Sequence, residues 1–522
     1  MNMIFSNSKL SKIYLPVLLT VLFIVVSGLA QAENPELIET AKHSNTEALQ
    51  SLLKDGADPD LRQTDGATAL HWATYRENLE MVNLLIAAGA NVNAVNRLNA
   101  SSLYLAAKAG NAELIEILLK AGANANQELT LGETAVMTAA RAGSAAGVQY
   151  LIDAGADVNA IENSREQTAL MWAAAQGHIG AVSALVNAGA DLDARSKERP
   201  RLMFADATNG GAFDQGINEL LGGFSPLLFA AREGHTDVAR LLLDAGAEIN
   251  GVAANGTSPL VVAAHSGHSD MAQMLIEKGA DTNLIGAGYN ALHASILRGD
   301  LDTVVTLLKH GADPDTRLEK PNPVQRASED WALKTPLVGA TPFWIAANFR
   351  EAEIMRALAN GGADPMLTNQ EQWSRPRERA DRASYTPQAI GGFTSTLQAA
   401  ITGDSTRGRF YVQPNSDPAG EERLALAAVI VAADLGVNLN HKDHNEATAM
   451  HDAAARGLPN IIRELAGRGA DVNALNNRGM TPLDLALRAE RRPNFFGFDL
   501  SVPGSSASDV LQEFGGVSSS AL

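Results

Sequence analysis

Two imidazoles and a carboxylate come together at His441, Lys442, Asp443 and His444, a combination that could hold a metal ion. No further ligand lies nearby in the sequence to complete a site. The chain has none of the patterns His-Glu-x-x-His, Gly-x-Ser-x-Gly, phosphate-binding loop or dinucleotide fingerprint. It also has no cysteine, which excludes disulfides, thiolate metal sites and a cysteine nucleophile. We therefore expect no catalytic, metal-binding or cofactor-binding residues.

A second group of side chains is suited to recognition. Cationic residues follow pairs of small residues at regular intervals, and aromatic residues recur close to them. Trp, Tyr and Arg are the usual anchors of protein interfaces. The predicted partner-binding residues are Trp72, Tyr75, Arg76, Lys108, Arg141, Trp172, Arg232, Arg298, Trp331 and Trp373, and the wider basic stripe also takes in His265, Arg456 and Arg488.

Two structural interpretations of the same residues stay open. Cations favour helix C-termini, where each contributes about 0.3–1 kcal/mol. Aromatic side chains can equally fill gaps between packed helices.

These residues occupy fixed places in an internal repeat. Gly-Ala-Asp and its variants recur from Gly56 to Gly515, and seven of the eleven steps between successive copies lie within one residue of 33. A fixed period of this length indicates stacked structural units. The longer steps predict insertions at about 197–222, 319–339, 370–392, 407–423 and 490–506.

The unit that begins at Ser225 shows how the repeat should fold. Ser225 is placed as a helix N-cap and Pro226 as the first helical residue. Gly234 ends this helix in a left-handed conformation, Thr236 caps a second helix, and Gly246 ends that one. Two short helices cannot bury enough surface alone, so we expect neighbouring units to stack.

The repeated words resemble those of the ankyrin repeat. "TALHWAT" begins at Thr68, "TAMHDAA" at Thr448, and "GADVNA" at Gly155 and Gly469. The resemblance covers almost all of the chain after residue 32. It implies an all-α, ankyrin-type α-solenoid of about 12 helix-turn-helix repeats, with finger turns and loop insertions.

The resemblance also implies a function. Ankyrin-like stacks bind partners on a concave side formed by first helices and finger turns, so we expect a non-catalytic protein–protein interaction scaffold. The alternatives are a secreted effector acting on host proteins and an enzyme whose site is built from the insertions. Structural roles are implied for the histidines of the Thr-x-x-His motif and for those after the interhelical glycine: His71, His293 and His451, and His178, His235 and His268.

The N-terminus has the pattern of an export signal. Lys9 and Lys12 precede an apolar run, and Ala30-Gln31-Ala32 follows it with a small-x-small cleavage pattern. The sequence thus predicts a signal peptide over residues 1–32, a solenoid over 33–522, and a periplasmic or extracellular location. An uncleaved anchor is the alternative, although the run is shorter than the ~20 residues of a spanning helix.

Charge limits the class of partner. The formal net charge is −18, and loss of residues 1–32 would remove two lysines and no acids. Such a balance disfavours nucleic-acid binding, which needs a basic footprint. We expect a protein partner that is acidic where it meets the basic stripe, no membrane span in the mature chain, and a monomer.

Overall fold

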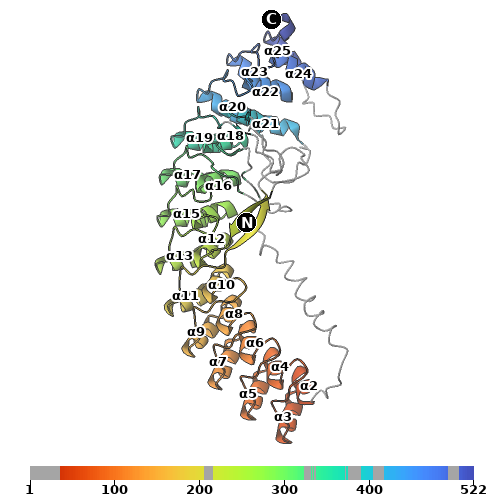
Figure 1. Cartoon of the computed structure of the whole chain (residues 1–522), viewed down its shortest axis with the longest axis vertical. Helices are drawn as coiled ribbons and strands as arrows, with labels where there is room; N and C mark the ends of the chain where they lie inside the picture. The colour runs from red at the N-terminus through yellow and green to blue at the C-terminus, as the bar shows by residue number, and fades with distance from the viewer. Residues whose placement is uncertain are drawn as a thin grey trace, which may run out of the picture. The chain divides into compact units, whose positions relative to one another are not determined.

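The chain folds into a long series of short helix pairs (Figure 1). The computed structural model describes residues 36–204, 216–322, 331, 333, 337–370, 372–373, 389–403, 417–491 and 505–522. Its internal contacts divide the chain into an N-terminal unit, residues 2–199 and 220–274, and a C-terminal unit, residues 200–219 and 275–522. The predicted signal peptide, residues 1–32, lies outside the described residues.

The N-terminal unit is built from alternating first and second helices. The first helices pack against one another in sequence order, and the second helices form a separate row (Figure 1). The first helices are α2 (Glu36–Lys42), α4 (Ala69–Tyr75), α6 (Ser102–Ala109), α8 (Ala135–Ala142), α10 (Ala169–Gln176), α12 (Pro226–Glu233) and α14 (Pro259–Ser266). The second helices are α3 (Thr46–Lys54), α5 (Leu79–Ala87), α7 (Ala112–Lys120), α9 (Ala145–Asp153), α11 (Ile179–Asn187) and α13 (Thr236–Asp244). The next second helix, α15 (Ser269–Glu277), contains the boundary of the unit.

The C-terminal unit repeats this arrangement with more irregular connections. Its helices are α16 (Ala291–Arg298), α17 (Leu301–Lys309), α18 (Pro342–Asn348), α19 (Ala352–Asn360), α20 (Thr396–Thr402), α21 (Pro418–Asp434), α22 (Ala449–Arg456), α23 (Pro459–Gly467), α24 (Pro482–Glu490), α25 (Ala507–Glu513) and the short 3-10 helix η2 (Ser519–Ala521). Helix α21 starts inside the range predicted as the 407–423 insertion, so the end of that range is helical.

Two small two-stranded sheets lie inside insertions that the sequence predicted as loops. Strands β1 (Arg199–Phe204) and β2 (Gly216–Leu221) form one two-stranded sheet within the predicted 197–222 insertion. Strands β3 (Gln372–Trp373) and β4 (Ala389–Gly391) pair antiparallel within the 370–392 insertion. These strands add to a helical fold without changing its class.

Local sequence explains where the helices begin and end. Ser225 Oγ accepts the Leu228 N–H at 3.3 Å, Pro226 is the first residue of α12, and Gly234 ends it with φ of +78°, as the sequence predicts. The prediction that Thr236 caps α13 is wrong. His235 occupies the N-cap position, and its side chain makes no capping bond because the ring packs against Gly177.

Small residues let the first helices approach closely. Each first helix from α6 to α12 carries a pair of alanines that are completely buried, such as Ala139 and Ala140 on α8. The second helices bury leucine and isoleucine behind them, including Leu114 and Leu118 on α7. Burying one such side chain stabilises the fold by about 1.5–3 kcal/mol, so the stacked pairs share a continuous apolar core.

Candidate functional site

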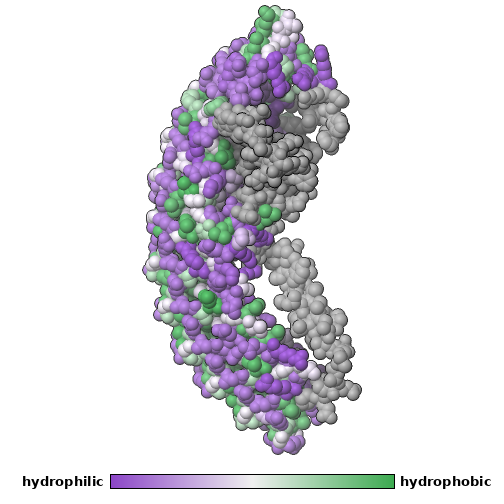
Figure 2. Space-filling model, in the orientation of Figure 1, coloured by the Kyte–Doolittle hydropathy of each residue, from purple (hydrophilic) through white to green (hydrophobic). Residues whose placement is uncertain are grey.

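The first helices of the N-terminal unit carry seven of the ten predicted binding residues. They are Trp72 and Tyr75 on α4, Arg76 at its end, Lys108 on α6, Arg141 on α8, Trp172 on α10 and Arg232 on α12. On the face drawn in Figure 2, the described surface is mainly hydrophilic, with separate small hydrophobic spots. Any recognition on such a surface must therefore combine polar and apolar contacts.

Three of these residues line one groove with a volume of about 580 Å³: Arg141, Trp172 and Arg232. Its lining residues come from α8, α10 and α12, from the finger turns that precede α8 and α10, and from the turn after α12. The other lining residues are Leu131, Glu133, Glu162, Ser164, Arg165, Gln167, Met171, Ala175, Gln176, Phe229, Glu233 and His235.

A guanidinium–aromatic stack occupies one part of this groove. The Arg141 guanidinium carbon lies 4.6 Å from the centre of the Trp172 ring, and Arg141 Nη2 lies 3.3 Å from Glu133 Oε1. The Trp172 indole donates its N–H to Gln167 Oε1 at 3.0 Å. The ring and the cation therefore hold each other in place, while 45 % of the Arg141 side chain stays exposed.

A second stack lies on α12. The Arg232 guanidinium carbon is 5.0 Å from the Phe229 ring centre and 5.4 Å from that of Phe224. Arg232 Nε pairs with Glu233 Oε1 at 2.7 Å, and 15 % of the arginine side chain is exposed. Phe229 itself is buried, so it supports the cation from within the core rather than presenting a free ring.

Two acidic residues that the sequence analysis did not select, Glu133 and Glu162, also line the groove. Glu133 Oε1 accepts hydrogen bonds from Tyr104 Oη at 3.2 Å, Thr138 Oγ1 at 2.9 Å and Arg141 Nη2. Burial and the neighbouring Glu133 charge raise the pKa of Tyr104 to about 12, so it remains a donor. The repeat could have pointed to Glu133, because this residue stands directly before Thr134, the N-cap residue of α8.

A third guanidinium in the groove also escaped the sequence analysis. Burial lowers the pKa of Arg165 from its usual value, and the positive charges of Arg199 and Arg232 act in the same direction, against Glu162. The arginines at this end of the groove thus repel one another. Arg165 lies in a finger turn, where a search confined to the residues after the alanine pair could not find it.

A separate aromatic cluster surrounds Trp72. Lys42 Nζ lies 5.2 Å from the Trp72 ring centre, and the Tyr75 ring meets Trp72 edge-on at 5.9 Å. Arg76 stacks over Tyr75 at 5.9 Å and donates from Nε to the Lys42 carbonyl at 2.9 Å. Tyr75 is 56 % exposed. Between the cluster and the groove, Lys108 is exposed and makes no ion pair with any described residue.

The predicted residues of the C-terminal unit have other surroundings. Arg298 on α16 stacks over Trp331 at 4.9 Å, so this insertion residue packs on its own chain. Trp373 lies in β3 opposite Ala389, and its side chain is outside the described part of the structure. His265 is buried and does not belong to an exposed stripe, which corrects its assignment from the sequence.

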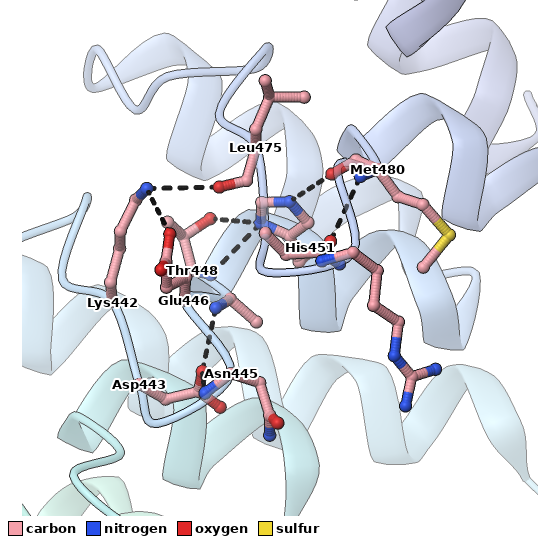
Figure 3. A network of polar contacts seen from close by, with 11 residues as sticks. Lys442, Asp443, Asn445, Glu446, Thr448, His451, Leu475 and Met480 are labelled. Carbon is pink, nitrogen blue, oxygen red and sulfur yellow. Dashed lines mark hydrogen bonds and ion pairs between the residues drawn. The ribbon is translucent and has the colours of Figure 1, made fainter.

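The histidines have structural roles where their bonds are described. In Figure 3, His451 accepts the Thr448 N–H at Nδ1 and contacts the Met480 carbonyl with Nε2, each at 3.1 Å. His71 makes the equivalent bonds to Thr68 and to the Ala100 carbonyl. His293 accepts a bond at Nδ1 only, and its buried Nε2 has no partner among the described residues.

The candidate metal-binding segment is occupied by turn contacts. His441 Nε2 lies 2.6 Å from the Phe393 carbonyl, and Lys442 donates to the Leu475 carbonyl at 3.2 Å (Figure 3). Asp443 accepts two backbone N–H groups of its own turn, at 2.8 Å each. Among the residues that the structure describes, no cluster of His, Asp or Glu has the arrangement of a metal site. Within that part of the chain, no helix combines the length and apolar character needed to cross a bilayer.

Comparison with known proteins follows the same repeats. A family model described as "Ankyrin repeats (3 copies)" matches residues 37–128, 103–196, 207–286 and 227–318, and one described as "Ankyrin repeats (many copies)" matches 430–486. Among solved structures, the human ASB11 ankyrin repeat domain matches at 24 % identity over 48 % of this chain and 99 % of its own, with a TM-score of 0.39. Ankyrin repeats indicate a scaffold for protein–protein interactions, and proteins built from them are generally non-catalytic. With more than half of its length matched by the first model alone, the chain belongs to the ankyrin-repeat family.

Proposed function

We propose that the chain is a non-catalytic scaffold that is exported from the cytoplasm and binds a protein partner on the first helices and finger turns of its N-terminal unit. The partner is acidic where it meets this surface. The observation that carries the proposal is the groove between α8, α10 and α12, in which arginines are held on aromatic rings and remain partly exposed.

Stacked arginines suit protein recognition for a physical reason. A free guanidinium on a long side chain loses rotamer freedom when it binds, and this loss opposes association. The Trp172 ring already restrains Arg141, so less freedom remains to be lost. Aromatic residues and arginine are also the types most enriched among residues that dominate binding energy.

Partner capture from the source organism tests this proposal. The purified chain, immobilised, should retain a specific protein from the cell-envelope fraction, identified by mass spectrometry. The double variant Lys108→Glu with Arg141→Glu should lose that protein, because both side chains are exposed on the binding surface. Circular dichroism should show an unchanged helix content.

A matched control carries the same charge change on the second helices. Lys54→Glu with Lys120→Glu alters two exposed lysines on α3 and α7 and should retain the protein normally. Equal loss with both double variants would assign the binding to net charge alone. Retention by all three chains would place the contact surface elsewhere.

Export and oligomeric state belong to the same proposal and have their own measurements. The Ala30-Gln31-Ala32 pattern supports cleavage that leaves Glu33 as the first residue. N-terminal sequencing of the protein from an envelope fraction should therefore begin at Glu33. Light scattering should give the mass of a monomer. A sequence that starts at Met1 would contradict cleavage, and the mass of a dimer would contradict the monomeric state.

A further inference from the structure

The groove of the N-terminal unit offers more unused hydrogen-bond donors than acceptors. Arg141 donates from Nη2 to Glu133, and its Nε and Nη1 groups make no hydrogen bond with any described residue. Arg232 uses Nε for Glu233, and within the described residues its two Nη groups donate to nothing. Two stacked guanidinium groups therefore keep donors directed to a ligand or to solvent.

Gln167 adds to this excess of donors. Its side-chain oxygen accepts the Trp172 indole N–H at 3.0 Å, so the amide nitrogen is the part of Gln167 that remains available. The same bond fixes which way the amide is turned. The groove lining next to Trp172 thus presents an N–H₂ group.

The carboxylates of the groove are mostly occupied. Glu162 is 4 % exposed, and its two oxygens accept four donors of its own turn, from the Ser164 N–H and hydroxyl and from the N–H groups of Arg165 and Gln167. Glu133 and Glu233 each keep one oxygen without a described partner, and each is neutralised by an arginine. The negative charges of these carboxylates are therefore largely compensated by contacts within the chain.

Arg165 strengthens the preference for an anion. It lines the groove together with Arg232, and it lies close enough to Arg199 for the two positive charges to repel each other. A ligand carboxylate bound among these groups would relieve that repulsion. Carboxylates also match the fork of a guanidinium with two parallel hydrogen bonds.

Apolar side chains stand beside these donors. Leu131 in a finger turn lines the groove and is 60 % exposed. Leu98 in the preceding finger turn is 59 % exposed. The Thr130 hydroxyl donates to the Leu98 carbonyl at 3.2 Å, so the two finger turns are in direct contact.

We infer that this groove binds an extended peptide segment in which carboxylate side chains alternate with apolar ones, the carboxylates on Arg141 and Arg232 and an apolar side chain against Leu131. In an extended segment successive side chains point to opposite sides, so acids and apolar groups can contact different lining residues of the groove. This inference rests on the proposed function, for which it names the recognised chemistry.

Synthetic peptides test the inference with the full chain and without the native partner. The probe is a short peptide that alternates glutamate with leucine and carries a neutral fluorescent dye, and fluorescence anisotropy reports its binding. Replacing each glutamate by glutamine should weaken binding at least about tenfold, because every charged contact becomes a neutral one. Added salt should also weaken the binding of the glutamate peptide.

Gln176 provides a gentle way to change the charge of the groove. It lines the groove at the end of α10, it is exposed, and it makes no hydrogen bond with a described residue, so its replacement removes no contact. Gln176→Glu should weaken the glutamate peptide about threefold and Gln176→Lys should tighten it about threefold, the effect of one exposed charge pair. Gln50→Glu and Gln50→Lys make the same changes on α3 and should alter neither affinity.

Equal binding of the glutamate and glutamine peptides would overturn the inference, as would no binding of either. So would equal effects at Gln176 and Gln50. None of these results decides whether a native protein is captured through Lys108 and Arg141, so this inference and the proposed function can fail separately.

Discussion

Glycine and histidine form a recurring contact between neighbouring repeats of the N-terminal unit. Gly143 ends α8 with φ of +78°, and a β-carbon there would lie 2.8 Å from His178 Nδ1. His178 Nε2 in turn contacts the Arg141 carbonyl at 3.1 Å. The ring therefore lies against the glycine and bonds one C-terminal carbonyl of the previous first helix, that of Arg141. This arrangement explains why histidine follows the next interhelical glycine so often.

Replacing such a glycine should cost more than backbone strain alone. Gly143→Ala should lower the free energy of unfolding by about 2–4 kcal/mol, combining left-handed strain with displacement of the His178 ring. Gly122→Ala is the matched control, because φ is +91° there but nothing lies within 4 Å of the added carbon. It should cost about 1–2 kcal/mol. Urea unfolding followed by circular dichroism measures both, and equal losses would show that the His178 contact contributes nothing.

A buried histidine should make the C-terminal unit sensitive to acid. Burial lowers the pKa of His293 from 6.5 to about 4. Between these values the unfolded chain binds a proton that the folded chain does not. The free energy of unfolding should therefore fall as the pH drops from 6.5 toward 4, by at most about 1.4 kcal/mol per pH unit.

His293→Gln should remove this contribution. The melting temperatures at pH 7.5 and pH 5 (~2.5 units apart) should therefore differ less in the variant than in the natural chain. Asp452 acts with the opposite sign. Burial raises its pKa from 3.8 to about 7, so between these values the folded state holds the extra proton and gains stability as the pH falls. Asp452→Asn should therefore make the acid sensitivity steeper. If His293→Gln left the pH dependence of the melting temperature unchanged, His293 would not be the source of the acid sensitivity.

At the scale of elements, a ladder of side chains links successive finger turns. In the C-terminal unit, Asn283 Oδ1 accepts the Asp313 N–H at 2.8 Å, while its Nδ2 donates to the Gly311 carbonyl at 2.9 Å. Asp315 holds the same place in the next finger turn and accepts the Asp364 N–H at 3.0 Å. A carboxylate cannot make the second, donating bond. Burial and the charges of Asp313 and Asp364 raise the pKa of Asp315, which marks this step as less favourable.

Asp315→Asn should repair the ladder. The new amide can donate to the Gly362 carbonyl as Asn283 does to Gly311, and one negative charge is removed from a crowded turn. We expect a gain of about 0.5–1.5 kcal/mol in the free energy of unfolding, measured by urea unfolding. Asn283→Asp is the reverse change and should produce a loss of similar size. A lower free energy of unfolding for Asp315→Asn would show that the missing bond to the Gly362 carbonyl does not weaken this turn.

The helices were predictable from the sequence, and several contacts between them were not. Capping residues and glycines mark α12 from Ser225 to Gly234, because those residue types act locally. The Arg141–Trp172 stack joins neighbouring repeats. The sequence did not reveal that Glu133 would form an ion pair with the same arginine. Strands β1 and β2 follow no repeat, so the period that indicated the helix pairs carried no information about them.

One arginine of the C-terminal unit contacts both the end of α20 and the first turn of α21. Arg350 adopts φ of +62°, and its side chain is 7 % exposed. Its Nη2 donates to the Gly403 carbonyl at 2.7 Å at the end of α20, and its Nη1 pairs with Glu421 near the start of α21. Arg350→Met should therefore destabilise α20 and α21 by about 3–5 kcal/mol, because it removes the bond to the Gly403 carbonyl and the ion pair with Glu421. Faster hydrogen exchange in these two helices measures the effect, and unchanged exchange would show that Arg350 does not stabilise them.

At the scale of the whole molecule, each helix pair depends on its sequence neighbours. Helix α7 packs with α6 and α9, and α23 packs with α21, α22 and α25. In a repeat protein built this way, stability is approximately a sum of local terms and nearest-neighbour terms. A single unfolding temperature therefore averages over the repeats, and local measurements are needed to locate an effect within the chain.

Two equivalent core truncations should show how far a disturbance spreads. Leu118 on α7 and Leu465 on α23 are both fully buried, and replacing either with alanine should cost about 2–5 kcal/mol locally. Leu118→Ala should speed hydrogen exchange in α6, α7 and α9 and leave α21, α22, α23 and α25 unchanged, whereas Leu465→Ala should do the reverse. Mass spectrometry of peptic fragments resolves these regions. Because only adjacent pairs share apolar surface, exchange that rises equally along the whole chain in both variants would mean that the solenoid unfolds as one cooperative body and that the nearest-neighbour description fails.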